Sequence, residues 1–130
     1  MRLAQLWALI AGVTLVLVGL LGFVPNPIVG GQTGALAPTD TLHNLVHLGT
    51  GVLALYISRL PGTALVNGVI GFGVLYVVIF VAVVASPTLF GLFSIPANIV
   101  LHFIHIALAG VSLGVGFIAR GESPVMATPR

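Results

Sequence analysis

The stretch TALVNGVIGFGVLYVVIFVAVVA, from Thr63 to Ala85, decides the class of fold. It contains no charged residue, and it exceeds the length of about 20 apolar residues that a helix needs to cross the hydrocarbon core of a bilayer. It belongs to a longer uncharged segment, 60–119, which has room for two such helices and a loop between them. The stretch therefore predicts a membrane-spanning helix with a second one after it.

The composition of the whole chain favours the same class. Of the 130 residues, 58% are hydrophobic and 5% are charged, and the mean hydropathy is +1.24. Soluble domains carry roughly a quarter charged residues because their surfaces face water. Four arginines and two acidic residues are too few for such a surface. The composition excludes a soluble globular domain, a disordered chain and a nucleic-acid-binding protein, and it predicts an integral membrane protein whose partner is the lipid bilayer.

Charged and turn-forming residues divide the chain into four predicted helices and a tail. Proline cannot continue helical hydrogen bonding, so the prolines near residues 25, 61 and 87 mark the limits of helices. We predict an all-α transmembrane domain over 1–120 and a polar cytoplasmic tail over 121–130. The first apolar run is longer than the core of a signal peptide, so we expect it to remain as a helix. The four helices are expected over 3–24, 40–58, 63–85 and 96–119.

The arginines predict the orientation of these helices. In the four-helix arrangement Arg2, Arg59 and Arg120 fall on one side of the membrane together with Arg130 in the tail. Basic residues are enriched on the cytoplasmic side of membrane proteins. We therefore expect a multi-pass protein with both termini in the cytoplasm and the loops outside.

The two halves of the chain resemble each other, which predicts two parallel helix-pair repeats. One register aligns Gly12 with Gly71, whereas a register one residue shorter aligns His47 with His105. Because two helices separate the copies, both copies would have the same orientation in the membrane.

All four histidines fall near the outer ends of the second and fourth predicted helices. At about 100° per residue, the polar residues of each helix share one arc. We predict that the two polar stripes face each other and that these two helices are adjacent. The candidate ligand-binding or interhelical polar residues are His43, Asn44, His47, Asn98, His102, His105 and Asp40.

Small residues on the same helices predict close helix packing. Some of them continue the polar stripes, and a G-x-x-x-G motif lies on another side of the fourth helix. The candidate packing residues are Gly51, Ala109, Gly110, Gly114 and Gly116.

The chemistry of imidazole leaves two interpretations of the stripes. Two histidines from different helices can bind the iron of haem or the central metal of chlorophyll, and three or four can hold zinc. Alternatively, neutral imidazoles hydrogen-bond across the helices, with Asp40, Asn44 and Asn98 as partners. The sequence favours hydrogen bonding and keeps ligand binding as the alternative.

Four segments carry a family resemblance: VGLLGFVP at 18–25, LHNLVHL at 42–48, LFGLF at 89–93 and NIVLH at 98–102. They are similar to the bacterial membrane family catalogued as domain of unknown function 4383. The resemblance implies four helices in a bacterial inner or photosynthetic membrane, with no established activity. An acid and a tryptophan commonly precede the second histidine motif in that family, whereas this chain has Asn98 and Val100 there. Members are frequent in photosynthetic bacteria, so the resemblance also implies a tetrapyrrole as a candidate cofactor.

The shortage of reactive side chains indicates a protein that is not an enzyme. Cysteine is absent, and the two acids, Asp40 and Glu122, are too far apart in the chain for an expected acid/base pair. We favour a non-enzymatic accessory or structural subunit of a larger membrane assembly. The alternatives are a tetrapyrrole-binding or metal-binding membrane protein and a small channel or transporter, whose path would use Thr14, Asn67 and Ser112.

Overall fold

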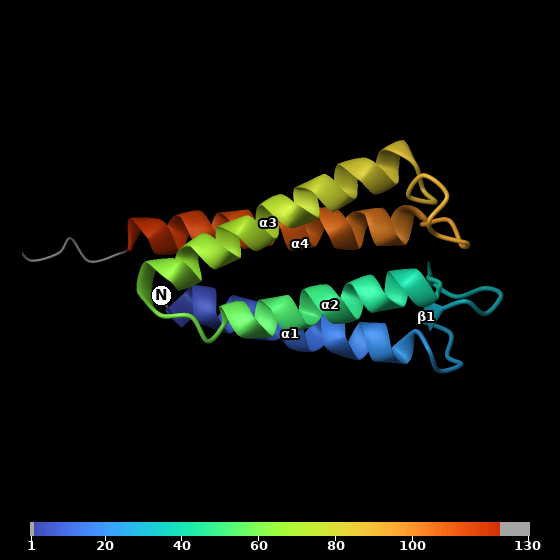
Figure 1. Ribbon diagram of the computed structural model, residues 1–130, viewed down its shortest axis with the longest axis horizontal. Coiled ribbons are helices and arrows are strands. Elements are labelled where there is room, and N and C mark those ends of the chain that lie inside the picture. The colour runs from blue at the N-terminus through green and yellow to red at the C-terminus, as the bar shows by residue number, and fades with distance from the viewer. Residues whose placement is uncertain (1, 123–130) are drawn as a thin grey trace, which may run out of the picture.

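The computed structural model describes residues 2–122 and contains four α-helices within them (Figure 1). Three of these helices are long and apolar enough to cross a membrane, namely the first, third and fourth. The chain is therefore a helical membrane protein. Residues 123–130, which make up most of the expected tail, lie outside the described part. The helices are α1 (Arg2–Leu21), α2 (Thr41–Ile57), α3 (Gly62–Ala85) and α4 (Ile99–Gly121).

The four helices form two antiparallel hairpins. Figure 1 shows α1 beside α2 and α3 beside α4, and these two pairs make most of the helix contacts. The hairpins touch each other mainly through α1 with α4 and α2 with α3. The backbones of α2 and α4 do not pack on each other, so the prediction that these two helices are directly adjacent is wrong. Only their side chains meet, as described below.

Small residues explain why each hairpin is tight. Gly51 faces α1, where an added Cβ would lie 2.7 Å from the backbone nitrogen of Val16. Gly116 faces α3, and Ala109 is completely buried. Gly51 therefore joins α2 to α1 instead of to α4, which is the physical reason for the incorrect pairing prediction.

Two other glycines of α4 do not contribute to this packing. Gly110 and Gly114 lie at exposed positions with no atom of the described chain within 4 Å of an added Cβ. The G-x-x-x-G motif thus faces outward, and the packing role expected for these two residues does not hold between the helices of the monomer.

Side-chain caps set the helix limits at the loop end. The α1 helix ends at Leu21, before the predicted residue 24, because the Asn26 amide donates to the Leu21 carbonyl oxygen at 2.8 Å. The α4 helix begins after Asn98, later than predicted, because the Asn98 side chain accepts from Leu101 N at 3.2 Å. The loop between α1 and α2 also contains two short parallel strands, β1 (Val29–Gly30) and β2 (Ala37–Pro38).

The outer faces of the helices are apolar, and the charged residues lie at the two ends. Large hydrophobic side chains such as Leu17, Val78 and Phe117 are more than half exposed, as expected for surfaces that face lipid. Arg2 begins α1 and Arg120 lies in the last turn of α4, and these two helix ends lie at the same end of the bundle in Figure 1. Both long loops lie at the opposite end.

A buried histidine cluster as the candidate functional site

Helix capping places the histidines at the loop end of the bundle. The Asp40 carboxylate accepts from His43 N at 2.8 Å and so starts α2 immediately before the first histidine. His47 follows one helical turn later on the same face. Asn98 starts α4 in the same way and leaves His105 two turns inside the helix. The two caps therefore bring His47 and His105 to the same depth in their helices, with His43 one turn nearer the loops.

The imidazole rings of His43, His47 and His105 form one cluster. The ring centroids of His43 and His47 are 4.6 Å apart, and that of His105 lies 5.7 Å from His43 and 6.3 Å from His47. One ring nitrogen of each residue lies within 4.8 Å of the other two. Each side chain is only 1% exposed. The polar stripes of α2 and α4 therefore meet through these rings.

These buried rings lack hydrogen-bond partners. Both nitrogens of His47 and the Nδ1 atoms of His43 and His105 are unpaired within residues 2–122. Buried polar atoms in native proteins are almost always paired, and leaving one unpaired costs about 1–3 kcal/mol. The Nδ1 atom of His102 is unpaired as well. The unpaired nitrogens of the three clustered rings are therefore available as metal ligands or as hydrogen-bonding groups.

The partners predicted from the sequence are bound elsewhere. The Asn44 side-chain oxygen accepts from the Thr39 hydroxyl at 2.6 Å. The Asn98 amide donates to the Leu36 carbonyl at 2.9 Å. The carboxylate of Asp40 binds loop and helix groups, as described below. The prediction that these three side chains hydrogen-bond the imidazole rings is therefore wrong, because backbone and loop groups near each helix start provide closer partners.

The cluster borders a partly open, mostly apolar pocket of about 180 Å³. Aliphatic side chains of α2 and α3 form most of its wall, and Tyr76 is the other polar residue in it. The Tyr76 hydroxyl lies 2.7 Å from the Thr50 hydroxyl. Phe93, from the loop before α4, stacks on His43 with a centroid distance of 4.5 Å and an interplanar angle of 1°. The aromatic contact covers one face of the His43 ring.

His102 lies outside this cluster. It precedes His105 by three residues, so its side chain is rotated by about 60° around the α4 axis. It is partly exposed and lines a separate apolar depression that also includes Phe80 and Phe103. The structure thus unites three of the four histidines and excludes the fourth.

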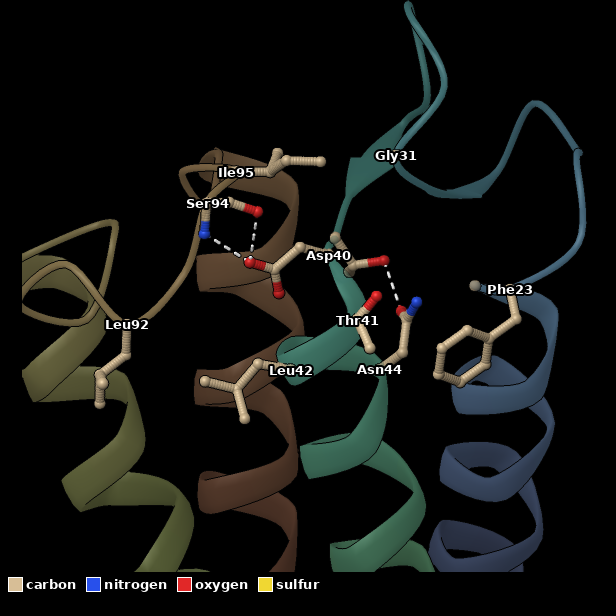
Figure 2. Close-up of a pocket in the computed structure, with 11 residues that line it drawn as sticks. Phe23, Gly31, Asp40, Thr41, Leu42, Asn44, Leu92, Ser94 and Ile95 are labelled. Atoms are coloured by element: carbon tan, nitrogen blue, oxygen red, sulfur yellow. Dashed lines mark hydrogen bonds between the residues drawn. The ribbon is translucent and has the colours of Figure 1, made fainter.

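A second, polar pocket of about 610 Å³ opens among the loops (Figure 2). There the second oxygen of Asp40 accepts hydrogen bonds from Ser94 N and from Ser94 Oγ, the latter at 3.0 Å. Burial raises the pKa of Asp40, but hydrogen bonds from His43, Ser94 and Ile95 outweigh this effect and hold the pKa below its ordinary value of 3.8. Asp40 is thus a charged link between α2 and the 86–98 loop.

Three residues of the site were not indicated by the sequence. Thr50 follows His47 by three residues and continues its stripe, so helical periodicity was a usable signal. Phe93 and Ser94 belong to a loop of irregular conformation, in which Leu89 and Phe90 have positive φ angles of 49° and 57°. No local pattern predicts which way such a loop turns its side chains.

Fold and cluster together define a small helical membrane protein with a buried histidine site. The chain belongs to the family described as domain of unknown function (DUF4383), whose model matches residues 5–118. This membership confirms the resemblance seen in the sequence. The comparison with curated proteins found no match, and the comparison with solved structures found none.

Proposed function

We propose that this protein binds a transition-metal ion through His43, His47 and His105. The observation that carries this proposal is the convergence of three buried imidazoles, four of whose six ring nitrogens are buried without a hydrogen-bond partner in the part of the chain that the structure describes. Neutral imidazole is a ligand for zinc, copper, iron and nickel ions. A bound ion would satisfy several unpaired nitrogens at once.

The distances between the rings suit a small rearrangement on binding. A metal–nitrogen bond of about 2.0–2.1 Å places ligand nitrogens roughly 3.3–3.6 Å apart. In the structure the three ring nitrogens lie within 4.8 Å of one another. Binding an ion therefore requires side-chain movements of about an ångström. Such movements are rotations of side chains and need no change in the helices.

The size of the cavity favours an ion over a tetrapyrrole. A volume of about 180 Å³ is below the roughly 300–1,000 Å³ typical of pockets for drug-sized molecules. The candidate polar path for a channel is also occupied, because Ser112 is fully buried and accepts from Trp7 Nε1 at 2.9 Å. Asn67 in turn accepts from Arg120 at 3.0 Å.

We propose that α2 also crosses the membrane, so that the protein has four spans. Its 17 residues give a length of about 25 Å, somewhat short for a hydrocarbon core of about 30 Å. However, α2 lies along α1 and exposes large apolar residues such as Val52 and Tyr56. With the arginines on the cytoplasmic side, both termini would be in the cytoplasm of a bacterial cell.

We also propose that the two hairpins are repeats. The caps support the register that aligns Asp40 with Asn98, because both residues accept from the backbone nitrogen three residues later. The same register aligns His47 with His105, which both belong to the cluster. A metal bound between two copies of one hairpin is consistent with a non-enzymatic subunit of a larger membrane assembly.

Metal analysis of the purified protein tests the proposed binding. The protein in detergent micelles should retain about one transition-metal ion per chain after loading and desalting, as measured by mass spectrometry. His47→Leu should abolish retention while leaving the metal-free fold intact, because replacing an unpaired buried polar group by an apolar one of similar size is nearly neutral.

The chain offers a matched control in His102. The His102→Leu variant removes an imidazole of the same helix that lies outside the cluster, so its metal content should equal that of the wild type. Failure of the wild-type protein to retain zinc, copper, iron or nickel would contradict the proposed function.

A further inference from the structure

We infer that the ion held by His43, His47 and His105 is monovalent copper, Cu(I), and not a divalent ion. This inference rests on the proposed three-histidine site and concerns the charge of the ion that suits it. The argument depends on three features: the ligands are neutral, the surroundings are apolar, and the site provides three ligands.

The cluster contains no negative charge to balance a divalent ion. No acidic residue lines the cavity among the residues that the structure describes. The nearest acid, Asp40, directs one carboxylate oxygen to His43 N and the other to Ser94. Its carboxylate therefore lies at the helix end and in the polar pocket, outside the ring cluster, and its charge reaches the His43 ring only through space.

Tyr76 does not provide an anionic ligand either. The Thr50 hydroxyl donates to the Val46 carbonyl oxygen at 2.8 Å, so its oxygen is free to accept from the Tyr76 hydroxyl, 2.7 Å away. In this arrangement the protonated Tyr76 hydroxyl donates its hydrogen bond to the Thr50 hydroxyl oxygen. The side chain lines the cavity as a neutral group.

The charge of the ion strongly affects the free energy of binding in apolar surroundings. The cost of moving an ion from water into a medium of low dielectric constant rises with the square of its charge, so it is roughly four times as large for a divalent ion. Neutral imidazoles reduce this cost but add no opposite charge. A monovalent ion is therefore the better match to a cavity whose walls are Val46, Ile79, Val83 and similar side chains.

The number of histidine ligands also favours Cu(I) over Zn²⁺. Zinc sites are almost always four-coordinate, with a water molecule in the fourth position when the protein provides three ligands. Here the space beside the three rings is apolar, and Phe93 stacks against His43 on one side. A water ligand would find few hydrogen-bond partners there, whereas Cu(I) is stable with three ligands.

The test compares Cu(I) with Zn²⁺ on the same protein. The full chain in detergent is loaded with each ion, with Cu(I) kept reduced and free of oxygen, and its affinity is measured by competition with a chromophoric chelator. We expect about one Cu(I) per chain and less than stoichiometric Zn²⁺. X-ray absorption of the copper form should show three nitrogen ligands near 2.0 Å.

Two variants test whether the measured Cu(I) affinity depends on the histidine cluster. His47→Leu should lower the Cu(I) affinity more than about tenfold, whereas His102→Leu should leave it unchanged. Retention of Zn²⁺ as tight as that of Cu(I), or a four-coordinate copper spectrum, would overturn this inference and leave the proposed metal site standing. Failure to bind any transition metal would overturn both.

Discussion

At the scale of single residues, His47 is the side chain of the described bundle with the most buried polar atoms that lack a hydrogen-bond partner. Both of its ring nitrogens are buried and unpaired, although serine, threonine and asparagine side chains lie on the same helices. Those side chains are engaged locally, as Asn44 is by Thr39. A residue that destabilises the metal-free fold in this way is best explained by what it binds, because a leucine there would pack without the cost of an unpaired polar group.

Asp40 shows how one residue can serve two elements, and its replacement is our prediction at this scale. In Asp40→Asn the side-chain oxygen still caps α2, but the amide nitrogen cannot accept from Ser94. We expect a loss of about 1 kcal/mol in the free energy of unfolding, comparable to the loss of a helix cap. Chemical denaturation in detergent measures it, and Ser94→Ala, which removes only the hydroxyl donor, should cost less.

The same residue predicts a pH dependence. Because the pKa of Asp40 is lowered in the folded protein, its stabilising effect is complete above the ordinary value of 3.8 and is lost as the pH falls through the lower folded value. As the pH falls below about 4, the free energy of unfolding of the wild type should therefore decrease more than that of Asp40→Asn. Equal acid sensitivity of the two proteins would show that Asp40 makes no such contribution.

At the scale of elements, close approach of backbones holds each hairpin together. Glycine at position 51 lets α2 lie so near α1 that a methyl group would have to displace the α1 backbone at Val16. Backbone atoms move only with the whole helix, so little local adjustment is available.

We therefore predict that Gly51→Ala destabilises the protein by about 1–3 kcal/mol, the usual cost of overpacking. The Gly110→Ala variant is the matched control, because its methyl group would meet open space on the outer face of α4. Unfolding in mixed micelles should give a clear loss for the first and little change or a small gain for the second, since alanine favours helix. Equal effects at both positions would contradict the observed packing.

At the scale of the whole molecule, the two ends of the bundle differ in charge. Arg2, Arg59 and Arg120 lie at the end opposite to Asp40 and the long loops. The histidine cluster is near the loop end, so the proposed orientation would place it close to the outer surface of the membrane.

Reporter fusions test this orientation. A reporter fused after residue 130 should be active only in the cytoplasm, and one inserted at residues 30–36 should be active only outside. Within that range, an insertion at 31–36 lies in the loop between α1 and α2 and avoids β1 and β2. Three helices, α2, α3 and α4, lie between the two reporter positions. Reporters found in the same compartment would require an even number of crossings between these positions and would contradict the proposed topology.

Much of the architecture follows from local properties of the sequence. Uninterrupted apolar runs predict helices for lipid surroundings, and prolines and capping residues limit their ends to within a few residues. The sequence predicted the start of the second helix at residue 40, and the Asp40 side chain caps it by acting on a backbone nitrogen only three residues away. Such interactions involve neighbours in the chain, so the sequence alone indicates them.

The tertiary structure decided which residues form the candidate site. Sequence periodicity puts His102 and His105 on one broad arc of α4, but the rotation of that helix against α3 turns only His105 into the cluster. Likewise, the loops and not the histidines bind Asn44 and Asn98. The sequence by itself determined a membrane bundle with histidines near one end, whereas their convergence into a buried and unpaired triad depended on helix rotation and loop path, which arise from contacts between distant residues.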